Sequence, residues 1–178
     1  VLADVGLLGQ PNAGKSTLIS KISSAKPKIA EYPFTTLSPN LGVVKINTYS
    51  SFVVADIPGL IPGASEGIGL GISFLKHLSR VKILLHLIDV KDGNLNQIEQ
   101  DFLEINKELK NFNDELIKKE QWVILSQIDK IPKKEINDIK NQAEKIFNNK
   151  NVFCVSSITG EGLKKLLEVI GNRLKDEQ

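Results

Sequence analysis

The sequence predicts an α/β fold of three layers, in which helices cover both faces of a mostly parallel β-sheet. Two observations carry this prediction. Short β-rich runs alternate with longer helix-like segments, and a glycine-rich loop lies between the first such run and the first such segment. The 178 residues are 41% hydrophobic and contain no repeat or flexible linker, so we expect one domain over residues 1–178.

Six apolar runs have the length and composition of β-strands. The second and third are separated only by residues 47–51, which is too short for a crossover connection. We therefore expect a six-stranded sheet in which this hairpin supplies one antiparallel edge strand. The expected strands are residues 3–8, 41–46, 52–56, 83–89, 122–125 and 152–155.

Five segments are expected to be helical because they are longer and carry apolar residues at helical spacing. Pro132 stands directly before one of them, where proline is a helix start signal. The expected helices are residues 15–23, about 70–80, 95–109 or beyond, 133–147 and 162–174.

The glycine-rich loop at residues 9–16 reads Gly-Gln-Pro-Asn-Ala-Gly-Lys-Ser, which is the spacing of a phosphate-binding P-loop. Its glycines let the chain turn tightly, so that backbone N–H groups and the positive end of the following helix converge on one anion. Lys15 is expected to reach the β and γ phosphates of a nucleotide, and Ser16 to ligate Mg²⁺.

Two further segments are candidates for the magnesium and γ-phosphate site. Asp56 ends the third strand run, where its carboxylate can hold Mg²⁺ through a water, and Gly59 can offer its N–H to the γ-phosphate. Residues 32–37 form a polar connector in which the hydroxyl of Thr35 or Thr36 could complete the magnesium shell when the γ-phosphate is present.

Composition gives no support to several other classes of function. The net charge of +2 and the pI of about 8.6 do not argue for nucleic acid, and no apolar stretch approaches the length of a membrane span. Cys154 stands alone, so an internal disulfide is excluded, and we expect a buried thiol in a reducing, cytoplasmic setting. The chain contains no methionine, so we expect it to be part of a longer protein.

With these segments in hand, the chain resembles the GTPase domain of the Obg family of translation-associated GTPases. The resemblance is close over the first 80 residues and holds at the level of fold beyond them. It rests on the P-loop, on Tyr32-Pro33-Phe34-Thr35-Thr36-Leu37 with Pro39-Asn40-Leu41-Gly42, on Asp56-Ile57-Pro58-Gly59-Leu60-Ile61, on Glu66-Gly67-Ile68-Gly69-Leu70-Gly71, and on Phe74-Leu75-Lys76-His77-Leu78.

The resemblance implies a Ras-like domain that hydrolyses GTP to GDP and phosphate with Mg²⁺. It also favours Thr36 over Thr35 as the threonine that binds Mg²⁺ when the γ-phosphate is present. It implies the large ribosomal subunit as partner, through domains that this chain lacks, because Obg proteins also carry a glycine-rich N-terminal domain and often a C-terminal extension. We expect no membrane partner and a monomer.

The motif that the resemblance assigns to guanine departs from the family pattern. The family has Asn-Lys-x-Asp after the fifth strand, and this chain has Ser126-Gln127-Ile128-Asp129. Asp129 keeps the carboxylate that accepts from the two guanine donors, whereas the shorter Ser126 can tie fewer loops together and Gln127 lacks the lysine charge. We expect lower affinity rather than lost specificity. Ser156-Ser157-Ile158 stand where backbone N–H groups would meet guanine O6.

The catalytic position also departs from the Ras pattern, because Leu60 replaces the glutamine that orients the attacking water. We therefore expect slow hydrolysis. In GTPases that resemble this one at the P-loop, an asparagine at the place of Asn12 helps to bind a monovalent cation, so K⁺ is a possible second cofactor. His77 and His86 lack a third ligand at metal spacing, and we expect both to be structural.

Two other functions remain open at this stage. One is an adenine-nucleotide P-loop ATPase, since a P-loop does not read the base, and the other is a nucleotide-dependent binding module with incidental turnover. The catalytic candidates are Lys15, Thr36, Gly59 and Asn12, and the expected metal ligands are Ser16, Thr36 and Asp56. The residues expected at the nucleotide are Gly9, Gln10, Pro11, Asn12, Ala13, Gly14, Lys15, Ser16, Thr17, Phe34, Thr35, Thr36, Asp56, Ile57, Pro58, Gly59, Ser126, Gln127, Ile128, Asp129, Ser156, Ser157 and Ile158.

Overall fold

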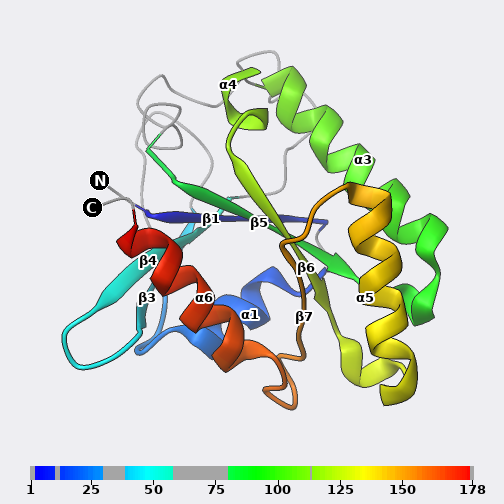
Figure 1. The fold of residues 1–178 in the computed structure, drawn as a ribbon. Coiled ribbons are helices and arrows are strands. Elements are labelled where there is room, and N and C mark those ends of the chain that lie inside the picture. Colours follow the sequence, from blue (N-terminus) through cyan, green and yellow to red (C-terminus); the bar gives the residue numbers. More distant parts are fainter. Residues whose placement is uncertain (1–2, 11–12, 30–38, 58–79, 113, 177–178) are drawn as a thin grey trace.

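The fold is an α/β sandwich of three layers, seen here in a computed structural model (Figure 1). The structure describes residues 3–10, 13–29, 39–57, 80–112 and 114–176. The strands are β1 (Val5–Gly9), β2 (Lys28–Ile29), β3 (Asn40–Lys45), β4 (Ser51–Asp56), β5 (Ile83–Asp89), β6 (Glu120–Ser126) and β7 (Val152–Cys154). The helices are α1 (Lys15–Ile22), α3 (Leu95–Phe112), α4 (Asp114–Ile117), α5 (Lys133–Phe147) and α6 (Leu163–Lys175), with single turns η3 (Lys91–Gly93) and η4 (Ile128–Lys130).

The sheet has the strand order β2-β3-β4-β1-β5-β6-β7. The pairs β4·β1, β1·β5, β5·β6 and β6·β7 are parallel, whereas β3 runs antiparallel to both of its neighbours. The predicted hairpin is confirmed as β3 and β4. Its turn is held by the side chain of Asn47, whose Oδ1 accepts hydrogen bonds from the N–H groups of Tyr49 and Ser50 at 2.8 and 2.9 Å.

The prediction of six strands was wrong by one, because the described sheet has seven. The additional strand, β2, pairs with β3 and takes the edge position that the sequence assigned to the hairpin. It consists of two exposed residues, Lys28 and Ile29, and therefore shows no alternation of buried and exposed positions. The mostly parallel α/β architecture itself is confirmed.

The alternation of side chains along β5 divides the core between the two faces of the sheet. Ile83, Leu85 and Leu87 pack with α1 and α6 on one face. Leu84 and Ile88 point to the opposite face, where they pack with α3, α4 and α5 in two further clusters. Figure 1 shows the two helical layers on either side of the sheet. A central strand that is buried on both faces explains the continuous apolar run.

The four long helices begin and end close to the predicted positions. Left-handed residues mark several boundaries: Gly14 precedes α1, Asn148 follows α5 and Gly162 precedes α6. The sequence did not predict α4, which has only four residues. The helix expected over residues 70–80 lies almost wholly outside the described residues.

Candidate functional site

The P-loop lies between β1 and α1 and needs glycine at both of its described ends. Gly14 has φ +90°, a left-handed conformation that side chains other than glycine rarely adopt. A Cβ added to Gly9 would lie 2.7 Å from the carbonyl oxygen of Leu87 on β5, so only glycine fits there. The N–H of Ala13 donates to the carbonyl of Gln10 at 3.0 Å, which closes the loop over the start of α1.

Lys15 and Asp56, both predicted site residues, are brought together as an ion pair. The ammonium of Lys15 lies 3.1 Å from Oδ1 of Asp56 and donates to the carbonyl of Ile57 at 2.9 Å. Both side chains are largely buried, with 8% and 13% of their surface exposed. Asp56 lies beside the P-loop because β4 pairs with β1 in a register that places Asp56 opposite Leu7.

The same corner has oxygen ligands of the kind that Mg²⁺ prefers. Oδ1 of Asp56 is buried and accepts no hydrogen bond, and it lies 3.1 Å from the ammonium of Lys15. Ser16 and Thr17 are exposed in the first turn of α1. A carboxylate and a hydroxyl at this edge therefore fit a magnesium ion whose remaining ligands are waters and phosphate oxygens.

Ser126, the first residue of the altered guanine motif, joins the end of β6 to the P-loop. Its buried hydroxyl donates to the carbonyl of Ala13 at 2.9 Å and lies 3.3 Å from the carbonyl of Ile88. The serine hydroxyl therefore lies within hydrogen-bond distance of both the P-loop and β5. Its single proton can be donated to only one of the two carbonyls at a time.

Asp129 and Ser156 come together from the two loops that the sequence assigned to base recognition. The hydroxyl of Ser156 is fully buried, donates to Oδ1 of Asp129 at 2.7 Å, and accepts from the N–H of Thr159 at 3.1 Å. Asp129 itself is exposed. Its second oxygen can therefore accept from a ligand while the first is held in place.

A backbone hydrogen bond joins the two loops that hold Asp129 and Ser156. Gln127 adopts a left-handed conformation, with φ +63°, at the start of η4, and the N–H of Ile128 donates to the carbonyl of Val155 at 3.3 Å. Gln127 and Ser157 are half-buried, whereas Ile158 is 74% exposed.

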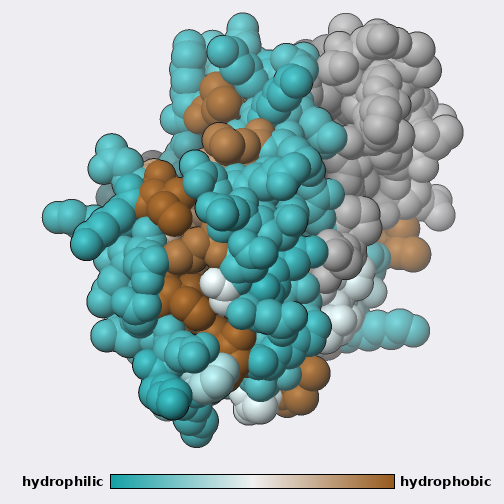
Figure 2. Space-filling model, turned by 90° about the vertical axis from the view of Figure 1, so that its right-hand side faces the viewer, coloured by the Kyte–Doolittle hydropathy of each residue, from teal (hydrophilic) through white to brown (hydrophobic). Residues whose placement is uncertain are grey.

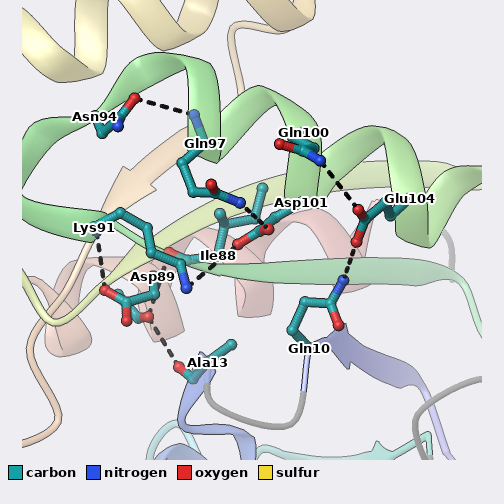
Figure 3. Close-up of polar contacts among 11 residues, drawn as sticks. Gln10, Ala13, Ile88, Asp89, Lys91, Asn94, Gln97, Gln100, Asp101 and Glu104 are labelled. Atoms are coloured by element: carbon teal, nitrogen blue, oxygen red, sulfur yellow. Dashed lines mark hydrogen bonds and ion pairs between the residues drawn. The ribbon is translucent and has the colours of Figure 1, made fainter.

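A set of polar contacts between the P-loop and α3 was not predicted (Figure 3). The side chain of Gln10 donates to Glu104 at 3.0 Å, and Gln100 donates to the same carboxylate at 3.4 Å. Nearby, Lys91 lies 3.9 Å from Asp101. No local pattern marks Glu104 in the sequence, because its partner is 94 residues away.

His86 lies on β5 behind the P-loop, where no described group bonds either of its ring nitrogens. Its ring stacks on Phe102 of α3 with centroids 5.2 Å apart, and Phe102 contacts Phe147 of α5 at 4.4 Å. Burial, and secondarily the charge of Lys15, lowers the pKa of His86 to about 3. The imidazole is therefore neutral near pH 7 and is part of the core.

Cys154, for which the sequence predicted a buried rather than a reactive thiol, is half-buried. Burial raises the pKa of its thiol to about 11, against a smaller opposing effect of Lys140. The thiol is therefore protonated and unreactive near neutral pH.

Seven predicted site residues lie outside the described residues, namely Pro11, Asn12, Phe34, Thr35, Thr36, Pro58 and Gly59. Their assigned roles stay predictions. His77 and Leu60 also lie outside the described ranges.

The fold and this site together define a P-loop nucleotide-binding domain with a mostly parallel sheet. Residues 4–127 match the family described as 50S ribosome-binding GTPase. Because the match covers more than half of the chain, the protein belongs to this family.

The resemblance to Obg is confirmed by two similar relatives. The GTPase Obg of Bdellovibrio bacteriovorus is 44% identical over 187 residues, which cover 100% of this chain and 54% of that protein. The GTPase Obg of Syntrophotalea carbinolica is 51% identical over 177 residues, covering 98% of this chain and 49% of that protein. The chain thus spans about half the length of these relatives.

Solved structures of GTPase domains share the fold. Era from Aquifex aeolicus, bound to GDP.AlF4-, is 25% identical with a TM-score of 0.67 over 94% of this chain and 55% of that chain. The G domain of the T. maritima FeoB iron transporter is 24% identical with a TM-score of 0.63 over 92% of this chain and 93% of that chain, which shows the fold alone.

Proposed function

We propose that this domain is a magnesium-dependent guanine-nucleotide switch that hydrolyses GTP slowly to GDP and phosphate. The observation that carries the proposal is the assembly of two pairs at one edge of the sheet. The pair of Lys15 and Asp56 would form the phosphate end, and the pair of Asp129 and Ser156 would form the base end. Ligands bind at the carboxyl ends of parallel strands in folds of this kind.

Each group has a role that its position supports. Lys15 would place a positive charge at the β and γ phosphates, and its ion pair with Asp56 would be exchanged for those contacts. Ser16 and Asp56 would hold Mg²⁺, which neutralises phosphate charge when bound. Asp129 would accept from the guanine N1–H and N2–H₂ donors, a contact that adenine cannot make. Thr36, Gly59 and Asn12, together with Lys15, are the proposed catalytic residues.

The proposed partner is the large ribosomal subunit, which the family description names. The chain spans only part of its relatives, so we expect the full-length protein to bind the subunit more strongly than residues 1–178 alone. None of the described helices is long and apolar enough to cross a membrane. We propose a cytoplasmic location, a monomeric state and a single GTPase domain over residues 1–178.

Single-turnover hydrolysis of GTP tests the proposed activity. Without a glutamine that orients water, the rate should fall well below the usual enzyme range of about 1–10³ s⁻¹. If Asn12 helps to hold a monovalent cation, KCl should accelerate hydrolysis over NaCl at equal ionic strength, because the cation adds positive charge where the transition state develops negative charge.

The Asn12→Ala variant is the matched comparison and should lose the potassium effect while keeping its GDP affinity. Equal rates in KCl and NaCl would remove Asn12 from the catalytic set. No release of phosphate over many hours in either salt would overturn the proposed GTPase activity.

A further inference from the structure

A cavity of about 320 Å³ lies between α5, β7 and the start of α6. None of the residues that line it belongs to the candidate nucleotide site. Ile136 and Phe153 supply apolar surface, and Lys133, Lys140 and Lys165 line it with positive charge. Its volume is within the range of small-ligand pockets. On the side of the molecule that includes α3 and α5, hydrophobic residues form a strip bordered by hydrophilic ones (Figure 2).

Two of the three lysines at this cavity, Lys133 and Lys165, lie in the first turn of a helix, where a positive charge is unfavourable. The first turn of α5 also contains Glu135, whereas the first turn of α6 has no acidic residue. The N-terminal end of a helix carries a partial positive charge, so a lysine there is repelled. Departures from the usual charge preference of a helix end are expected at functional or strained sites.

Basic residues are also concentrated in this part of the chain. Residues 130–175 contain ten lysines or arginines and five acidic residues, whereas the rest of the chain contains 13 and 16. The mild net charge of +2 therefore conceals a basic C-terminal part and an acidic remainder. Three of these lysines, Lys133, Lys140 and Lys165, line the same cavity, and positive charge that is concentrated in one place attracts polyanions.

We propose that this cavity binds one nucleotide unit of single-stranded RNA. The base would lie against Ile136 and Phe153, and the flanking phosphates would contact Lys133, Lys140 and Lys165. A positively charged groove with an aromatic side chain for base stacking is the usual combination for single strands, and Phe153 is the aromatic residue here. Three lysines suit phosphates as point charges, whereas carboxylates of an acidic peptide favour the fork of arginine. Glu161, which also lines the cavity, could accept from a base amino group.

Fluorescence anisotropy with a labelled single-stranded RNA of about 12 nucleotides tests the proposal, with and without saturating GDP and Mg²⁺. Because the cavity is separate from the P-loop, binding should be seen in both conditions, whether or not the proposed GTPase function holds. Affinity should fall with salt, with a slope of about −0.7 in log K against log salt for each phosphate neutralised. Lys165→Glu should reduce affinity about tenfold and make the slope shallower.

The thermal midpoint separates binding from a structural role. Lys165→Glu places an acidic residue in the first turn of α6, so its Tm should rise while RNA binding falls. The control is Lys110→Glu, which makes the same charge change at an exposed position in the last turn of α3. It should lower Tm and leave RNA affinity within about twofold of the original.

Ile136→Ala tests the apolar contact without a change of charge, and it should weaken RNA binding while sparing binding of a polyphosphate of equal charge. Equal losses in Lys110→Glu and Lys165→Glu would mean that only diffuse charge attracts RNA, and the proposal would be wrong. Tighter binding of a poly-glutamate peptide than of RNA at the same salt would also overturn it and identify an acidic protein as the ligand.

Discussion

At the scale of single residues, Ser126 shows how a departure from a family motif is accommodated. The side chain is shorter than asparagine, but its hydroxyl reaches the carbonyl of Ala13 at 2.9 Å because β6 ends close to the P-loop. The hydrogen bond connects residues 113 positions apart, so it couples the loop proposed to contact the base to the loop proposed to hold the phosphates.

Removing this hydroxyl should therefore weaken nucleotide binding. Ser126→Ala leaves the buried carbonyl of Ala13 without its side-chain donor, and we expect GDP affinity to fall about tenfold, or roughly 1.4 kcal/mol. Titration of a fluorescent GDP measures the change. Ser20→Ala, at an exposed position on α1, is the matched control and should bind GDP normally.

The reverse substitution examines the same contact. Ser126→Asn with Gln127→Lys restores the family motif and should tighten GDP binding. A double variant with unchanged affinity, together with a normal Ser126→Ala, would show that these loops are organised differently from the family pattern.

At the scale of elements, β5 holds a neutral histidine whose ring packs against Phe102 of α3. The pKa of His86 is about 3 in the folded protein and 6.5 in the unfolded chain. Between these values only the unfolded chain binds the proton, so the stability present above pH 6.5 is lost as the pH falls toward 3.

A His86→Leu variant should lack this loss. From about pH 7.5 to pH 5, the original protein should lose roughly 2 kcal/mol more of its free energy of unfolding than the variant does. Urea denaturation of both proteins at the two pH values measures the difference, and the carboxylates common to both cancel in the comparison. The same pH dependence in both proteins would show that His86 can take up a proton in the folded state.

The sequence predicted those helices and strands whose burial produces a recognisable pattern of apolar residues. β5 is a continuous apolar run because both of its faces are covered, and α5 begins after Pro132 and ends before Asn148. β2 could not be predicted, because its two exposed residues depend on pairing with β3 rather than on burial. Pairing across the sheet is a tertiary effect, and no local pattern records it.

At the scale of the whole molecule, the sheet brings four distant segments of sequence to one edge. Sequence patterns identified Lys15 and Asp56 as candidates, and the resemblance to Obg implied Asp129 and Ser156; the structure pairs them as two contacts. The sequence could not predict the hydrogen-bond partners of these residues where the partner is a backbone carbonyl or a side chain on another element. Ile57 accepts from Lys15, and Glu104 accepts from Gln10, contacts that depend on strand register and helix placement.

The central claim is that this edge of the sheet binds a guanine nucleotide, and competition between fluorescent GDP and ADP tests it most directly. In Mg²⁺, GDP should bind at least tenfold more tightly than ADP, about 1.4 kcal/mol or more, and removal of Mg²⁺ should weaken GDP binding. Asp129→Asn should shift the preference toward xanthine nucleotides, because it replaces an acceptor with a donor. Equal affinity for GDP and ADP in the unmodified protein would contradict the account.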